Sequence, residues 1–254
     1  MPSWSTPEVT GSLPRPPAPQ PAAPTPAGST LGDKLPATIG GPALRAAALS
    51  GDPAAAYEIA SRYSEGRGVA QNSEEAARWF ERAAKQGLAP AQFRLGGLYE
   101  KGIGVKKDLA AARDLYLAAA GKSNGKAMHN LAVLYAEGIN GPPDYRDAAH
   151  WFRMAADRGV TDSQYNLGIL YARGIGVELN LAESFKWFVL AANQGDKDAA
   201  KKRDEIEVKL DQQSLAAARL AVQTWAPQAQ PDDAITVKNG AWDSAPGGAA
   251  PVKP

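Results

Sequence analysis

The clearest pattern along the chain is a stripe of apolar residues at helical spacing. Between residues 89 and 102, the stripe contains Ala91, Leu95 and Tyr99 at steps of four. Between residues 109 and 120, a second stripe consists of Ala112, Leu115, Tyr116 and Ala119. A polar, glycine-containing stretch separates the two stripes. The pattern predicts two amphipathic helices joined by a loop.

This two-helix pattern occurs four times, at a step of 36 residues. The step relates tyrosines of the first helix, aromatic residues of the second helix, and alanine pairs near its end. The tyrosines are Tyr63, Tyr99, Tyr135 and Tyr171, and the second-helix rings are Phe80, Tyr116, Phe152 and Phe188. The units are 51–86, 87–122, 123–158 and 159–194. First helices are predicted near 53–65, 89–101, 125–137 and 161–173, and second helices near 73–86, 109–121, 145–157 and 181–194.

Turn residues support these boundaries. A glycine follows each first helix, where a left-handed residue is favoured (Gly66, Gly102, Gly138 and Gly174). An Asn or Asp precedes each second helix, where its side chain can cap free N–H groups (Asn72, Asp108, Asp144 and Asn180). Small residues recur inside the first helices (Ala60, Gly96, Ala132 and Gly168), which predicts close approach of a bulky second-helix aromatic. We expect Trp79, Trp151 or Trp187, with the adjacent Phe, to fill that space.

The two ends of the chain differ from the repeats. Ten of the 20 prolines lie in residues 1–40, which predicts a disordered linker. Residues 41–50 resemble the end of a preceding second helix and are predicted to cap the array. Residues 195–225 are predicted to cap the other end, as one helix or as two if Asp211 starts a second one. Residues 226–254 are predicted to be a flexible tail.

Composition restricts the chemistry. The net charge is +1 and no basic run occurs, so nothing indicates a nucleic-acid partner. The chain has no cysteine, which excludes disulfides and thiolate metal sites. Its two histidines, His129 and His150, lack partners at metal-ligand spacing, and His150 lies in a column predicted to be exposed. We therefore predict no catalytic residues, no metal and no cofactor, and a hydrolase is disfavoured.

The fixed spacing of the recurring residues resembles the Sel-one-like repeat, a relative of the tetratricopeptide repeat. In the fourth unit the matching residues are Leu167–Gly168, Tyr171, Gly174, Gly176–Val177, Asn180, Trp187–Phe188, Ala191–Ala192 and Gly195. The third unit departs from the pattern in its loop, where Ile139–Asn140–Gly141–Pro142–Pro143 stands. The resemblance implies an all-α, right-handed α/α solenoid that is a non-catalytic protein-interaction scaffold.

A second resemblance concerns the C-terminal part. The run at 199–225, followed by 231–243, is similar to the end of the PodJ family of alphaproteobacterial polar localisation and organelle-development factors. This resemblance implies that the chain is the periplasmic domain of a single-pass inner-membrane protein, anchored upstream, that recruits envelope partners at the cell pole. The N-terminus itself lacks a signal-peptide pattern.

In the related tetratricopeptide geometry, the first helices line the concave face. One column on that face is aromatic: Tyr57, Phe93, His129 and Tyr165. Beside it lie a polar column of Glu58, Arg94, Asn130 and Asn166, and a column that includes Val133 and Ile169. These rings either pack only between adjacent first helices or bind a protein or peptide in the groove. Stacking on peptidoglycan glycan is the alternative. His129 would make binding sensitive to pH between about 6 and 8.

Overall fold

The computed structural model describes residues 35–139, 141–238, 240 and 242. Within these residues the chain is helical and contains no strand. The first helices are α2 (Pro53–Glu65), α4 (Ala89–Lys101), α6 (Gly125–Glu137) and α8 (Thr161–Arg173). The second helices are α3 (Ser73–Lys85), α5 (Leu109–Ala120), α7 (Tyr145–Ala156) and α9 (Leu181–Asn193). The eight predicted helices are confirmed, with starts as predicted and ends within one residue.

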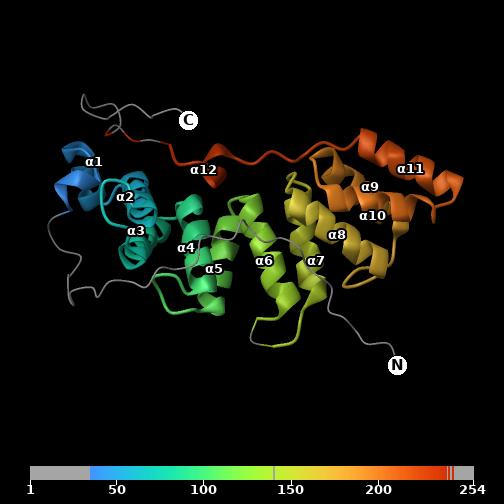
Figure 1. The fold of residues 1–254 in the computed structure, drawn as a ribbon, viewed down its shortest axis with the longest axis horizontal. Helices are drawn as coiled ribbons and strands as arrows, with labels where there is room; N and C mark the ends of the chain where they lie inside the picture. The colour runs from blue at the N-terminus through green and yellow to red at the C-terminus, as the bar shows by residue number, and fades with distance from the viewer. Residues whose placement is uncertain (1–34, 140, 239, 241, 243–254) are drawn as a thin grey trace.

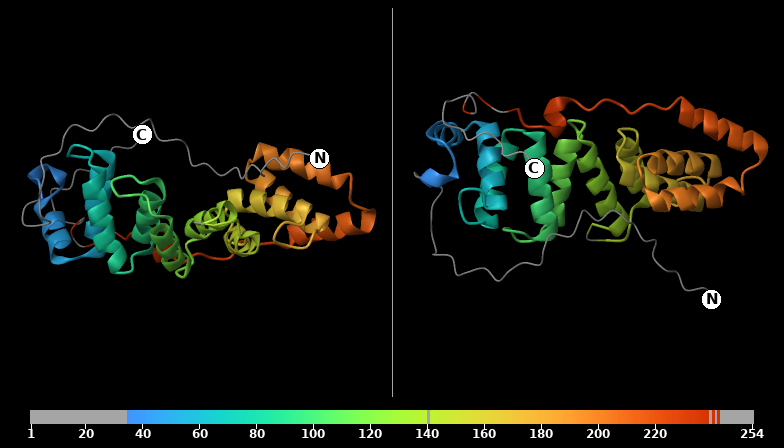
Figure 2. Two further views of the ribbon diagram at one scale, coloured as in Figure 1. Left: turned by 90° about the horizontal axis from the view of Figure 1, so that it is seen from below. Right: turned by 45° about the horizontal axis from the view of Figure 1, so that its top comes forward.

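The helices stand side by side in one row that follows the order of the chain (Figures 1 and 2). Each helix packs against the next, both within a repeat and between repeats. The described chain is therefore a solenoid, in which a repeat buries its apolar face mainly against its neighbours.

The predicted N-caps are confirmed for the second helices. For example, the Asn180 side chain accepts a hydrogen bond from Glu183 N at 3.0 Å. Three first helices end at a left-handed glycine: Gly66, Gly102 and Gly174. Gly138 of the third repeat adopts a different conformation, with ψ 109°, because its loop has a different sequence.

The interior glycines allow close packing, as predicted. A Cβ atom added at Gly168 would lie 2.8 Å from Cε1 of Phe188, and one at Gly96 would lie 2.7 Å from Cε1 of Tyr116. The ring that fills this space is thus the Phe or Tyr of the second helix. Of the tryptophans named with it, Trp79 and Trp187 are buried, whereas Trp151 is only half-buried.

The second loop glycine couples one repeat to the next. At Gly176, φ is 70° and an added Cβ would lie 2.0 Å from Tyr145 O, at the start of α7. Gly104 makes the equivalent approach to Ser73 O, at the start of α3. The loop of a repeat therefore lies on the second helix of the preceding repeat.

The N-terminal cap starts earlier than predicted. It consists of a 3-10 helix, η1 (Ala37–Ile39), and α1 (Pro42–Ser50). Ile39 is fully buried, and its carbonyl accepts a hydrogen bond from Arg62 Nη1 at 2.8 Å. The linker prediction is therefore wrong for residues 35–40, because Ile39 belongs to the core. Residues 1–34 lie outside the described residues.

The C-terminal cap consists of two helices, α10 (Lys197–Glu207) and α11 (Gln212–Gln223). Asp211 starts the second by accepting from Ser214 N at 2.8 Å. The chain then turns back along one long edge of the row and forms a short helix, α12 (Asp232–Ile235), beside α4 (Figure 1). The prediction of a flexible tail is wrong for 226–238, which contact the repeats. Residues 243–254 lie outside the described residues.

Candidate partner-binding surface

The predicted aromatic column is paired with rings of the second helices. Each first-helix ring packs against the second-helix ring of its own repeat, at centroid distances of 5.3 to 6.0 Å. The pairs are Tyr57–Phe80, Phe93–Tyr116, His129–Phe152 and Tyr165–Phe188. The packing alternative foresaw contacts between adjacent first helices, but these ring partners lie on the second helices.

The column is unevenly accessible. Tyr57, Phe93 and Tyr165 are half-buried, whereas His129 is 6% exposed. A partner on this face could contact the three half-buried rings but would not reach the imidazole. The strip is therefore interrupted at the third repeat.

His129 is held in a closed environment. A hydrogen bond of 2.7 Å joins its Nδ1 to Oγ of Ser163, which is fully buried in α8. Burial lowers the pKa of His129 below its ordinary value, against a smaller opposing effect of Asp162. The expected titration of an exposed groove histidine near neutral pH is therefore not supported.

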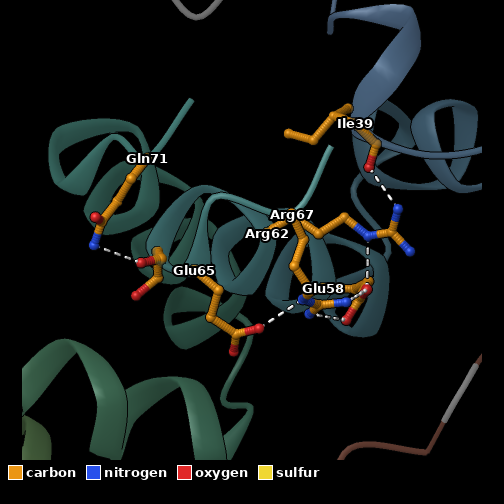
Figure 3. A network of polar contacts seen from close by, with 7 residues as sticks. Ile39, Glu58, Arg62, Glu65, Arg67 and Gln71 are labelled. Carbon is orange, nitrogen blue, oxygen red and sulfur yellow. Dashed lines mark hydrogen bonds and ion pairs between the residues drawn. The ribbon is translucent and has the colours of Figure 1, made fainter. Parts of the chain in front are cut away.

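Glu58, the first member of the polar column, is already engaged by two arginines (Figure 3). Arg62 Nε donates to its Oε1 at 2.7 Å, and Arg67 Nη1 donates to the same oxygen at 3.0 Å. Arg67 also pairs with Glu65, and Arg62 contacts Ile39 O. Glu58 therefore organises the N-terminal end of the array.

Asn130 and Asn166 point into the packing between helices. Asn130 Nδ2 donates to Tyr116 Oη at 2.9 Å, and Tyr116 Oη donates to Glu100 at 2.6 Å. Burial of Tyr116, followed by the charge of Glu100, raises the pKa of its hydroxyl. Asn166 is 4% exposed, and its Nδ2 has no hydrogen-bond partner among the described residues.

Three predicted residues remain for a partner beside the rings. Arg94 is exposed on α4, and Val133 and Ile169 are half-buried. Val133 packs against the cluster of the third and fourth repeats, and Ile169 against the cluster next to the C-terminal cap. The accessible part of the face is thus a mixed surface with one cation. Whether these residues bind a partner stays a prediction.

A charged cluster between the third and fourth repeats was missed by sequence reasoning. Glu183 accepts from Lys186 Nζ at 2.9 Å and from Trp187 Nε1 at 3.1 Å, and Arg153 Nη1 lies 3.4 Å from it. Although burial opposes its charge, Lys186 and then Arg153 lower the pKa of Glu183. The only sequence signal was the position of Glu183, three residues after the cap Asn180.

The described residues hold no group of three or more His, Asp or Glu side chains arranged to bind a metal ion. None of the helices described is long and apolar enough to cross a membrane.

Comparison with protein families identifies the repeat. A family model described as Sel1 repeat matches residues 53–88, 89–124, 125–160 and 161–196. The four matches follow one another without a gap, so the model covers more than half of the chain. No curated protein matches the chain.

The chain is also similar to proteins of known structure, of which one shares its fold and more than a third of its residues over the matched part. A Sel1 repeat protein from Oxalobacter formigenes is 36% identical with a TM-score of 0.59, over 64% of this chain and 47% of that protein. The chain thus spans about half the length of this relative. A protective antigen of uropathogenic Escherichia coli with an SLR fold is 22% identical (TM-score 0.36, 83% and 60% covered). A Sel1 repeat protein from Klebsiella pneumoniae is 21% identical (TM-score 0.32, 64% and 97% covered).

Proposed function

Because the chain belongs to the Sel1 repeat family, we propose that it is a non-catalytic scaffold that binds a protein partner on the face of its first helices. Proteins built from Sel1 repeats are generally protein-interaction scaffolds. The observation that carries the proposal is the recurrence of half-exposed side chains on successive first helices: Tyr57, Phe93 and Tyr165, with Val133, Ile169 and the exposed Arg94. Half-buried aromatics are typical anchors at protein interfaces.

A protein partner suits this face better than a glycan does. Stacking on a sugar ring requires an open aromatic face, but the three rings already pack against second-helix rings. Their remaining edges, together with two aliphatic side chains and a guanidinium, suit a peptide or helix. Peptidoglycan binding is therefore the second candidate.

We further propose that the partner is an envelope protein and that the chain works in the periplasm at a cell pole, as part of a membrane-anchored protein. The support is the resemblance of 199–225 and 231–243 to polar localisation factors, and the lack of cysteine is compatible with an oxidising compartment. Fractionation of cells that produce the natural full-length protein would test this location. Recovery in the cytoplasmic fraction would contradict it.

The binding face is tested by crosslinking capture from an envelope extract, with purified peptidoglycan pelleting in parallel. Arg94→Glu combined with Ile169→Glu should lose the proteins captured by the parent. Arg146→Glu makes the same charge reversal at an exposed position of α7, on a second helix, and should retain them. Circular dichroism would confirm that the variants are folded.

The possible results separate the two candidates. Loss of specific captured proteins in the double variant alone supports the scaffold proposal. Pelleting with peptidoglycan that the double variant loses, without captured protein, supports the glycan alternative. Equal capture by all three chains would place the binding face elsewhere.

A further inference from the structure

The segment after Trp225 lies against the repeats like a bound peptide. It leaves α11 and runs back toward the first repeat, in the direction opposite to the array (Figures 1 and 2). Its start and its course are marked by contacts of Trp225, Ala234 and Trp242. Trp225 packs against Trp187 at 6.4 Å between ring centroids, Ala234 is fully buried, and Trp242 packs against the apolar cluster around Ile39 and Ile59.

The segment contacts the turns that join one repeat to the next. Gln228 N donates to Asp157 O at 2.7 Å. The Gln230 side chain accepts from Gly125 N at 2.8 Å through Oε1 and donates to Arg158 O at 3.5 Å through Nε2. One glutamine therefore bridges two successive inter-repeat turns by binding only their backbone.

Asn124 makes a side-chain contact with the segment that the equivalent residues of the neighbouring repeats cannot make. Its Oδ1 caps α6 by accepting from Ala127 N at 2.9 Å, and its Nδ2 donates to the carbonyl oxygen of Ala234. Asn124 is 4% exposed and Ala234 is 0% exposed. The equivalent residues of the neighbouring repeats, Leu88 and Val160, have no side-chain donor. The position of the segment along the array is therefore set at the third repeat.

Most of the segment has few buried contacts. Residues 226–229 and 231–233 are exposed, as are Ile235 and Thr236. Between the contacts of Trp225 and Trp242, residues 226–238 are held by one buried alanine and a few hydrogen bonds. Such a stretch opens at a low free-energy cost compared with the helices of the core. The surface beneath it is thus accessible to a competing segment without unfolding of the repeats.

We propose that the edge formed by the turns at 123–125 and 157–160 is a binding site for an extended segment of a partner protein, and that residues 226–238 are its intramolecular occupant. The partner segment has a glutamine followed four residues later by a small residue. The glutamine reaches the Gly125 N–H and the Arg158 carbonyl, and the small residue fits where Ala234 is buried. This inference goes beyond the proposed function, because it names a second surface, separate from the face of the first helices, and its recognition chemistry.

Charge indicates a further feature of the partner segment. Asp232 and Asp233 immediately precede Ala234 and are exposed, while Lys122 and Lys126 lie two residues on either side of Asn124. Acidic residues between the glutamine and the small residue would therefore favour binding, in a way that weakens with added salt. Tethering gives the chain's own segment an effective concentration that reaches the millimolar range for short flexible links. A free segment binds well only when the tether-held copy is released.

The test uses the full chain and a fluorescent peptide with the sequence of residues 226–238. In a released variant, Gln230→Ala with Ala234→Arg, only the occupant is changed and the turns stay intact. Fluorescence anisotropy should show at least about tenfold tighter peptide binding to the released variant than to the parent, because the competitor is removed.

A second substitution in the released variant identifies the site. Asn124→Asp keeps the capping oxygen of α6 but removes the donor to the Ala234 carbonyl, and should weaken peptide binding by about tenfold or more. Asn180→Asp makes the same exchange at the cap of α9 and should leave binding unchanged.

Three results would overturn the inference. These are no peptide binding by a folded released variant, peptide binding that Asn124→Asp leaves unchanged, and a parent that exchanges tails in a dimer by light scattering. The last result would make a second copy of this chain the occupant. Failure of the peptide to bind, with envelope capture still dependent on Arg94 and Ile169, would reject this site and leave the proposed function standing.

Discussion

His129 of the third repeat and Ser163 of the fourth share a hydrogen bond of 2.7 Å across the boundary between their repeats. Both side chains are buried, and Nε2 of His129 has no partner among the described residues. A proton added to this ring would place a charge in a closed, nearly apolar space. Burial therefore lowers the pKa of His129 in the folded chain.

This burial predicts a loss of stability in mild acid. The unfolded chain binds a proton at His129 as pH falls through about 6.5, whereas the folded chain resists it until the lower folded pKa is reached. Stability should thus fall with decreasing pH between these two values and be fully present above them. His129→Phe, which copies Phe93 of the second repeat, should flatten this part of the profile in denaturant melts. His150→Phe, on the exposed side of α7, is the control and should leave the slope unchanged. An unchanged slope in His129→Phe would contradict the prediction.

Trp187, in the last repeat, should contribute more to the free energy of unfolding than Trp151, at the equivalent position of the third repeat. Trp187 is fully buried and packs beneath Arg153, whose guanidinium carbon lies 5.1 Å from the ring. Trp187→Ala should cost about 3–5 kcal/mol of unfolding free energy. Trp151→Ala should cost less, because Trp151 is half-buried. His150→Ala should remain within about 0.5 kcal/mol of the parent, and a loss like that of Trp187→Ala would show that the exposed face of α7 is wrongly assigned.

Two helical glycines should respond in opposite directions to substitution by alanine. At Gly168 the added Cβ would lie 2.8 and 2.9 Å from atoms of the buried Phe188 ring, so Gly168→Ala should destabilise by about 1–3 kcal/mol. At Gly97 the nearest atom would be Tyr116 Oη at 3.5 Å, an ordinary contact. Gly97→Ala should therefore stabilise α4 by up to about 1 kcal/mol. Thermal melts of the two variants would check this, and equal effects would argue against close packing at Gly168.

The contribution of Glu183 to stability, through its ion pairs between the third and fourth repeats, should depend on pH. Lys186 and Arg153 lower its pKa in the fold, so its contribution is present above the unfolded pKa and is lost as pH falls through the folded value. Glu183→Gln should cost about 1–2 kcal/mol at pH 7 and progressively less in acid. Glu81→Gln removes an exposed ion pair with Lys85 and should change little at any pH. A Glu183→Gln deficit that persists unchanged in acid would show that packing, rather than charge, is lost.

Local patterns in the sequence were sufficient to predict the number of repeats, their step and the limits of the eight repeat helices. These features depend on local physics: apolar spacing, an Asn or Asp cap, and a glycine that ends a helix all act within a few residues. The need for small residues at 96 and 168 was also readable, because a repeated glycine in a helix is costly unless something approaches closely. The identity of the approaching ring was less clear, since Trp187 and Phe188 are adjacent and only their positions around the helix separate them.

Which surface residues remain accessible, and how the two ends of the described chain pack, depend on contacts between distant parts of the fold. The columns Tyr57 to Tyr165 and Glu58 to Asn166 follow from the repeat, but His129 and Asn166 are buried while Arg94 is exposed. Residues at equivalent positions of the four repeats are not equally buried, because the side chains packed around them differ from repeat to repeat. The contact of Ala234 with Asn124 joins residues 110 positions apart. No local pattern encodes such a contact: residues 226–238 have a composition typical of a loop, and only the array of turns on which they lie gives them a fixed position.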